Sequence, residues 1–318
     1  MAQKKDFPGR DLISLNDFSR EELELLFFQT DRIKQNPAKF AHSLEGKIIV
    51  PLFFENSTRT KVSFQFATLR LGAQYSSWDV STSSVQKGEN LADTIKTIEQ
   101  FSPDAFILRH NEDGSAQFAA DLTNVPVINA GDGKHEHPTQ TILDLYTIQE
   151  LRGNIDGLKI GITGDLKYGR TVHSLVSALS IYNNCQVHFF SPEILKFPEE
   201  AKKESEKTVE IFEHPFGEMK KILPSCDILY MTRIQRERFQ EGIEGQNEYN
   251  EISKTYHLVP ETLEGVSKDF KIMHPLPKVE EIDFKIDKTP YAHYFAQVGN
   301  GMWTRMAELY LILGGKNE

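Results

Sequence analysis

The fold of this chain is constrained most by a repeated alternation of short apolar runs with amphipathic helical patterns. In the first half, strands are predicted at 47–54, 74–80, 105–109 and 125–129, and helices at 19–34, 62–71, 91–101, 115–122 and 138–151. The first helix opens with Ser19 and Glu22 at the spacing of a capping box. Strands that alternate with helices in this way are typical of a parallel sheet covered by helices.

A second alternating series follows a glycine-containing turn at 151–157. Strands are predicted at 158–163, 186–190, 209–212, 227–231 and 270–273, with helices at 171–182 and 296–313. A length of 318 residues allows about two domains. We therefore expect two doubly wound α/β domains at 1–150 and 151–295, with the C-terminal helix within 296–318 packed back on the first. The active site is expected in the cleft between them.

The charge and cysteine content argue against several classes of function. Asp and Glu outnumber Lys and Arg by 46 to 36, and a net charge of −10 opposes nucleic-acid binding through a basic surface. The longest apolar run, at 48–54, is too short to cross a membrane, and the first ten residues lack the apolar core of a signal peptide. We expect a cytoplasmic protein. Cys185 and Cys226 lie in no Cys/His cluster, so neither a disulfide framework nor a metal site is expected.

A polar turn at 55–60 separates a predicted strand from a predicted helix. Its hydroxyls, backbone N–H groups and one guanidinium can converge on an oxyanion such as phosphate. The same pattern also fits an ordinary helix N-cap with a surface arginine. No glycine-rich loop ending in Lys-Ser or Lys-Thr is present, so a P-loop nucleotide site is not expected.

Two further polar loops lie in the first half. The loop at 83–89 carries Lys87 before a glycine, which suits either delivery of a charge to phosphate or an ordinary solvated loop. The loop at 132–140 contains His135 and His137. His137 precedes Pro138 at a predicted helix start, where the helix dipole favours a neutral imidazole that can polarise a carbonyl oxygen. We expect His135 to face solvent and not to bind a metal.

In the second half, two arginines follow predicted strands at equivalent places. Arg170 lies in the turn at 164–171, which lacks the glycine fingerprint of a dinucleotide site, so no nicotinamide cofactor is expected. Arg233 is followed two residues later by Gln235. Two guanidinium groups can bind a dicarboxylate, although structural salt bridges to the many acids explain them as well. The prolines at 275 and 277 fix backbone carbonyls that can accept hydrogen bonds from an amine or amide.

Taken together, these residues resemble the carbamoyltransferase family over nearly the whole chain. The resemblance is carried, in this order, by the segments 57–60, 86–89, 137–140, 164–174, 230–238 and 274–277. It implies transfer of a carbamoyl group from carbamoyl phosphate to the amine of L-aspartate, giving N-carbamoyl-L-aspartate and phosphate in pyrimidine biosynthesis. It also implies that the first domain binds carbamoyl phosphate, that the second binds aspartate, and that no cofactor is needed.

The resemblance further implies roles for individual residues. Carbamoyl phosphate would be bound by Ser57, Thr58, Arg59, Thr60, Ser83, Lys87, Arg109, His137, Gln140, Pro275 and Leu276. Of these, Arg59, Thr60, Lys87, Arg109 and His137 would be catalytic, and aspartate would be bound by Lys87, Arg170, Arg233 and Gln235. Glu55 would orient an arginine. Ser83 and Lys87 would come from the neighbouring subunit of a homotrimer with shared active sites.

The implied reaction needs no nucleophilic side chain or metal. Attack by the amine creates a tetrahedral oxyanion that Thr60, Arg109 and His137 can stabilise, while Arg59 and Lys87 stabilise the departing phosphate. Two alternatives remain. One is transfer to ornithine or a related amine, against which Arg233, Gln235 and Pro275 argue, because the ornithine branch places Cys after the last histidine. The other is a non-catalytic anion sensor. A regulatory chain or another pathway enzyme can join the trimer without a signal in this sequence.

The acidic, glycine-containing segment at 237–254 departs from the family pattern in length and composition. Its composition suggests a mobile loop more than a packed element. We assign no catalytic residue to it.

Overall fold

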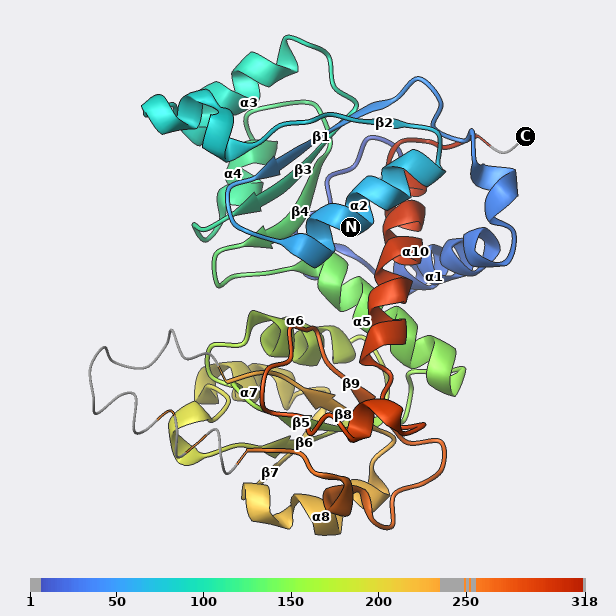
Figure 1. Ribbon diagram of the computed structural model, residues 1–318, viewed down its shortest axis with the longest axis vertical. Helices are drawn as coiled ribbons and strands as arrows, with labels where there is room; N and C mark the ends of the chain where they lie inside the picture. Colours follow the sequence, from blue (N-terminus) through green and yellow to red (C-terminus); the bar gives the residue numbers. More distant parts are fainter. Residues whose placement is uncertain (1–6, 235–248, 250–251, 253–255, 317–318) are drawn as a thin grey trace. The chain divides into compact units, whose positions relative to one another are not determined.

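The computed structural model describes residues 7–234, 249, 252 and 256–316 (Figure 1). The chain divides into two compact units, the first formed by residues 1–146 and 299–318 and the second by residues 147–298. The chain passes from the first unit to the second within helix α5 (Pro138–Arg152), and it returns to the first unit within helix α10 (Tyr294–Ile312). The boundary expected at 150 also falls inside α5. Gln235 and the loop expected at 237–254 lie outside the described residues, except for Tyr249 and Ile252.

The first unit is built on a four-stranded parallel sheet of order β2-β1-β3-β4, whose strands are labelled in Figure 1. The strands are β1 (Ile48–Phe53), β2 (Gln74–Tyr75), β3 (Ala105–His110) and β4 (Val127–Asp132). The helices of this part of the chain are α1 (Arg20–Gln35), α2 (Thr58–Arg70), α3 (Leu91–Glu99) and α4 (Ser115–Ala120). Ile95 of α3 and Ala116 of α4 pack on Leu52, Phe106 and Leu108, because parallel strands bury both faces.

The second unit holds a five-stranded parallel sheet of order β7-β6-β5-β8-β9. The strands are β5 (Lys159–Thr163), β6 (Gln186–Phe190), β7 (Glu210–His214), β8 (Ile228–Met231) and β9 (Lys271–Met273). Helices α6 (Arg170–Leu179), α7 (Glu199–Ser205) and α8 (Met219–Ile222) accompany them. Two parallel α/β sheets confirm the predicted fold class. Across the described residues, no helix has the length and apolar character needed to span a membrane.

Three elements of the first unit differ most from their predicted bounds. The strand expected at 74–80 ends at Tyr75, because Asp79 accepts a hydrogen bond from the Ser81 N–H and starts a 3-10 turn, Val80–Thr82. The helix expected from residue 62 begins at Thr58, in a polar first turn that has no apolar periodicity. The strand expected at 125–129 is shifted to 127–132, where Asp132 pairs with His110 in the sheet.

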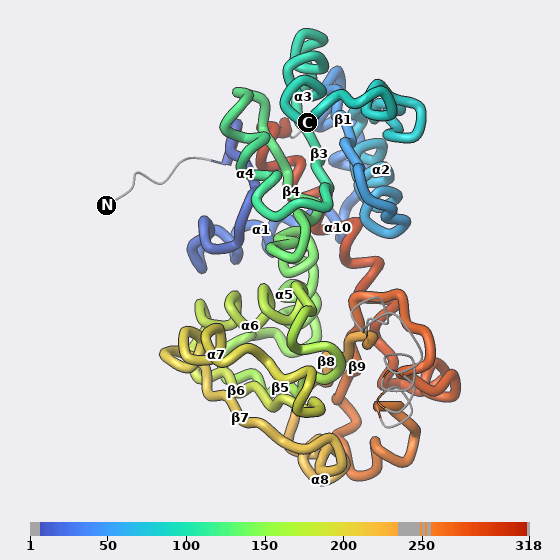
Figure 2. Tube along the Cα trace, turned by 90° about the vertical axis from the view of Figure 1, so that its left-hand side faces the viewer, coloured from blue at the N-terminus to red at the C-terminus, as the bar shows by residue number. Residues whose placement is uncertain are grey.

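One turn of α10 carries two buried charged residues. Arg305 is 3% exposed and Glu308 is 0% exposed. The Arg305 guanidinium donates a hydrogen bond to Ser63 Oγ at 2.5 Å and lies 4.9 Å from the ring centroid of Phe64. These contacts join α10 to α2, which lie side by side in both views (Figure 1, Figure 2).

Hydrogen bonds compensate the burial of the Glu308 carboxyl less well than the burial of the Arg305 guanidinium. Among the described residues, neither of its carboxyl oxygens has a hydrogen-bond partner. Burial raises the pKa of Glu308 to about 8, although the nearby Arg305 charge opposes the change. Burial also lowers the pKa of Arg305 to about 10. Burial therefore disfavours the charged form of both side chains in this turn of α10.

Glu308→Gln is expected to stabilise the protein more at high pH than at low pH. A carboxyl whose pKa is higher in the folded chain than its ordinary 4.5 costs stability as the pH rises from 4.5 to about 8. Glutamine cannot ionise, so its advantage should grow through this window by about 1.4 kcal/mol per pH unit. Urea unfolding of both proteins at pH 5, 7 and 9, at the same protein concentration, measures the difference in their free energies of unfolding. The exposed Glu24→Gln serves as control, and a gain independent of pH would contradict the prediction.

Candidate functional site

The turn between β1 and α2 presents an open helix N-terminus. Ser57 is the N-cap of α2 and has extended backbone angles, but its side chain makes no capping hydrogen bond. Thr58 and Arg59 are exposed in the first helical turn, and Thr60 is buried. A helix start whose N–H groups are not capped by a side chain is suited to binding an anion. The missing capping bond argues against the simple N-cap interpretation of this turn.

Thr60 and His137 meet inside the first unit. The Thr60 hydroxyl Oγ1 lies 3.4 Å from His137 Nε2, and both residues are buried. His137 directly precedes Pro138, the first residue of α5, and its Nδ1 lies 3.3 Å from Thr139 Oγ1. The structure thus brings together two predicted site residues that are 77 positions apart in the chain.

Arg109 is held on β3 by two acceptors. Its Nη1 donates to the Ala130 carbonyl at 3.0 Å, and its Nη2 lies 3.2 Å from Glu55 Oε2. The Arg109 side chain is 13% exposed and the Glu55 side chain 31% exposed. Because Glu55 lies just before the open turn of α2, the ion pair places Arg109 beside that turn.

Three other predicted residues of the first unit lie in ordered local structure. Gln140 Nε2 donates to Asp144 Oδ1 at 3.0 Å on α5. Ser83 caps the 3-10 turn Ser84–Lys87, because its Oγ accepts from the Val85 N–H at 3.3 Å. Lys87 ends this turn with an exposed side chain.

In the second unit, the turns that carry Arg170 and Arg233 pack on each other. Arg170 is the first residue of α6, and Arg233 follows β8. The Asp165 N–H donates to Thr232 Oγ1 at 3.1 Å. Gly164 has a φ of +112°, and a Cβ there would lie 2.1 Å from the Thr232 carbonyl oxygen. Glycine is therefore required for the close approach of these two turns.

The segment after β9 is fixed by a buried histidine. His274 is 1% exposed, its Nε2 lies 2.8 Å from Glu281 Oε1, and its Nδ1 lies 2.8 Å from the Leu276 nitrogen. Leu276 has a φ of +57°. Burial favours the neutral form of Glu281, but the hydrogen bonds that its carboxylate accepts from His274 and from the Val279 N–H outweigh burial and keep the Glu281 pKa below its ordinary value. The carbonyls of Pro275 and Leu276 are thereby held in place.

Sequence reasoning missed a buried carboxylate in the loop before His137. Asp132 is 1% exposed and accepts hydrogen bonds from several segments. His135, expected to face solvent, is 53% exposed in its side chain and lies beside Asp132. No sequence signal distinguishes this aspartate from an exposed one, because its burial and its contact with the Gly114 N–H, 18 positions away, arise only in the fold. The described residues include no group of three or more side chains that could hold a metal ion.

Comparison with known proteins identifies the family. A model described as the carbamoyl-P binding domain of aspartate/ornithine carbamoyltransferase matches residues 10–150, and the Asp/Orn binding domain of the same family matches residues 156–312. The chain belongs to the aspartate/ornithine carbamoyltransferase family. Within this family, it is 47% identical over 313 residues to the aspartate carbamoyltransferase catalytic subunit of Thermococcus onnurineus, covering 97% of this chain and 98% of that relative.

Other members of the aspartate/ornithine carbamoyltransferase family are similarly close. The aspartate carbamoyltransferase catalytic subunit of Methanopyrus kandleri is 47% identical and covers 97% of this chain and 99% of its own length. Aspartate transcarbamoylase from Trypanosoma cruzi, solved with N-(phosphonacetyl)-L-aspartic acid, has a TM-score of 0.90 at 33% identity, with 96% and 97% of the two chains covered. The catalytic subunit of M. jannaschii aspartate transcarbamoylase has a TM-score of 0.86 at 43% identity, with 94% and 96% covered.

Proposed function

We propose that this chain transfers the carbamoyl group of carbamoyl phosphate to the amino group of L-aspartate, producing N-carbamoyl-L-aspartate and phosphate for pyrimidine biosynthesis. The observation that carries the proposal is the contact of Thr60 with His137 beside the open N-terminus of α2. The family match supports it, as does a relative, the T. cruzi enzyme, solved with carbamoyl phosphate and aspartate. Free, buried cysteines at 185 and 226 fit a reducing, cytoplasmic location.

In this proposal, the first unit binds and activates carbamoyl phosphate. The start of α2, with Ser57, Thr58 and Arg59, binds the phosphate, because its N–H groups and dipole favour an anion. Thr60, Arg109 and His137 surround the carbamoyl oxygen and stabilise the negative charge that develops on it. Lys87 and Arg59 stabilise the charge of the leaving phosphate. Preorganised donors of this kind are effective because they need little rearrangement during the reaction.

The second unit supplies the groups that select the amino acid. Arg170, Arg233 and Gln235 bind the two carboxylates of aspartate, since a guanidinium can take a carboxylate with two parallel hydrogen bonds. The Pro275 and Leu276 carbonyls accept hydrogen bonds from the nitrogens of the reactants. Ornithine would place a second ammonium group against these arginines, where like charges repel.

We further propose that three copies of the chain assemble with shared active sites. One face of α2 exposes Val62, Phe66 and Leu69, which are 43%, 51% and 56% exposed. Their spacing of four and three residues places them on one side of the helix. A contiguous apolar stripe of this kind is typical of a protein interface. Because the same helix begins with the phosphate-binding turn, a second copy on this stripe would lie near that turn and could contribute Ser83 and Lys87.

The purified protein is expected to form N-carbamoyl-L-aspartate from carbamoyl phosphate and L-aspartate, with negligible product from ornithine. Mass spectrometry of both possible products, with phosphate release measured in parallel, tests the proposal directly. Turnover with ornithine but none with aspartate would overturn it. Arg233→Ala serves as an internal check, because loss of one guanidinium should raise the KM for aspartate about tenfold or more and affect the KM for carbamoyl phosphate less.

A further inference from the structure

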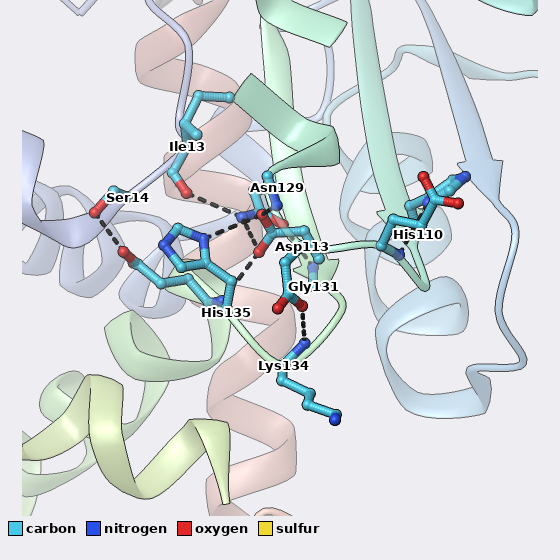
Figure 3. Close-up of polar contacts among 12 residues, drawn as sticks. Ile13, Ser14, His110, Asp113, Asn129, Gly131, Lys134 and His135 are labelled. Atoms are coloured by element: carbon cyan, nitrogen blue, oxygen red, sulfur yellow. Dashed lines mark hydrogen bonds and ion pairs between the residues drawn. The ribbon is translucent and has the colours of Figure 1, made fainter. Parts of the chain in front are cut away.

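Asp132, at the end of β4, gathers four hydrogen-bond donors. Its Oδ1 accepts from Asn129 Nδ2 at 3.1 Å and from the Glu136 N–H at 3.0 Å. Its Oδ2 accepts from the Gly114 N–H at 3.1 Å and lies 3.2 Å from His135 Nδ1. The donors come from β4, from the start of α4 and from the loop that follows Asp132 (Figure 3). One buried carboxylate therefore ties three segments of the first unit together.

The loop that Asp132 closes is fixed along its length. The Asp132 N–H donates to the Glu136 carbonyl at 3.1 Å, and the Gly133 N–H donates to the His110 carbonyl at 2.8 Å. Gly133 has a φ of +49°, and a Cβ there would lie 2.0 Å from Asp113 Oδ1. The Glu136 carboxylate accepts from Ser14 Oγ at 2.7 Å, a contact drawn in Figure 3. His137 is the next residue after this loop.

We propose that Asp132 is a positioning residue for His137. Through the 133–136 loop, it sets the place from which the His137 ring reaches Thr60 Oγ1. The inference rests on the proposed function, in which His137 acts on the carbamoyl oxygen. Only an ionised carboxylate offers two acceptor oxygens, each able to accept two hydrogen bonds. An amide in its place would turn an NH₂ group toward two other donors, and the loop would have to shift.

Asp132→Asn tests this role by changing one atom of the side chain. A displacement of about 1 Å in a catalytic group can cost about 100-fold in rate, so we expect kcat to fall by about 10- to 100-fold. The KM values for carbamoyl phosphate and aspartate should stay within about threefold, because the α2 turn and the arginines of the second unit make none of these contacts. Unchanged kcat in a folded variant would overturn the proposal.

A double-mutant cycle separates positioning from general damage to the fold. In a His137→Ala background, Asp132→Asn should change kcat by less than about threefold, because the group that it positions is gone. If Asp132→Asn lowers kcat in that background by as much as it does in the wild type, Asp132 acts on a group other than His137. Asp104→Asn is the matched control, since Asp104 also accepts a backbone N–H, that of Ile48 at 2.8 Å, but at a different place in the unit. It should leave kcat unchanged.

A second variant keeps the inference testable if Asp132→Asn does not fold. Gly133→Ala displaces the same loop by steric contact with Asp113 and leaves the Asp132 carboxylate intact. It should give the same fall in kcat with unchanged KM values, and normal kcat in this variant would count against the proposal. Wild-type formation of N-carbamoyl-L-aspartate is measured in the same experiment. If the wild-type protein forms no N-carbamoyl-L-aspartate, the proposed function is refuted. If the wild type is active and the effects of Asp132→Asn and His137→Ala on kcat are additive, only the positioning role is refuted.

Discussion

Replacing Arg109 with alanine is expected to lower kcat about 1000-fold. The Arg109 guanidinium is held by the Ala130 carbonyl and by Glu55, and in the proposed function it stabilises charge on the carbamoyl oxygen. Loss of one preorganised donor to an oxyanion typically costs 100- to 1000-fold, and here a full positive charge is lost as well. Steady-state kinetics with each substrate varied in turn measure the effect, and a fall of less than about threefold would contradict it.

A second substitution at Glu55 separates two contributions of Arg109, which are its own positive charge and its neutralisation of the Glu55 carboxylate. Without Arg109, the Glu55 carboxylate is left without its ion-pair partner just before the turn proposed to bind phosphate, and it should repel an anionic substrate. Adding Glu55→Gln to Arg109→Ala is therefore expected to recover about tenfold in kcat/KM for carbamoyl phosphate. Arg152→Ala is the control, because Arg152 forms a similar pair with Asp227 at 3.3 Å in the second unit. It should change kcat/KM by less than about threefold.

Mixing two inactive variants is expected to restore activity if active sites are shared between subunits. Lys87→Ala and Arg233→Ala should each lower the activity about 100-fold or more, since each removes a charge proposed to bind substrate. In a mixed trimer, one site can combine Lys87 of one copy with Arg233 of the next. Random assembly from equal amounts should therefore recover about a quarter of wild-type activity, because about three quarters of the trimers are mixed and each mixed trimer has one intact site of its three.

The matched control for this experiment uses two residues expected on the same side of a shared site. Mixing Arg109→Ala with Arg233→Ala should restore nothing, because each copy then lacks a group that its own site needs. Hybrids carrying two different affinity tags can be purified and their subunit composition checked by native mass spectrometry. Lack of recovery in proven hybrids of the Lys87 and Arg233 variants, or equal recovery in the control, would refute site sharing.

The fold class could be predicted because parallel strands are buried on both faces and leave continuous apolar runs, as at Ile48–Phe53. Elements without such a run were harder to predict. Helix α7 (Glu199–Ser205) is short and mostly charged, so it shows no apolar periodicity and was not predicted. The first turn of α2 was missed for the same reason, although it carries the residues proposed to bind phosphate. Its polarity is what the proposed function requires and what hides a helix from pattern analysis.

The candidate site, like the fold, could be predicted from the sequence only in part. Side chains in recognisable motifs, such as His137 and Arg233, could be named from the sequence, because the motif supplies both residue type and spacing. Contacts between segments that are distant in the chain could not be predicted from the sequence. The meeting of Thr60 with His137 and the approach of the Gly114 N–H to Asp132 depend on how strands β1, β3 and β4 align. An aspartate that accepts four hydrogen bonds looks the same in a sequence as one in water.

The hydrogen bonds of His274 also fix where its proton resides. The Leu276 N–H can only donate, so His274 Nδ1 must be the bare, accepting nitrogen, and the proton must sit on Nε2, which faces the Glu281 carboxylate. Both nitrogens are thus engaged in a residue that is 1% exposed. The lone pair of Nδ1 is occupied by the Leu276 N–H, so His274 is not free to take a proton from an attacking amine. The histidine that precedes Pro275 and Leu276 in the chain therefore acts as a fixed dipole, and the proton released in the reaction must leave by another route.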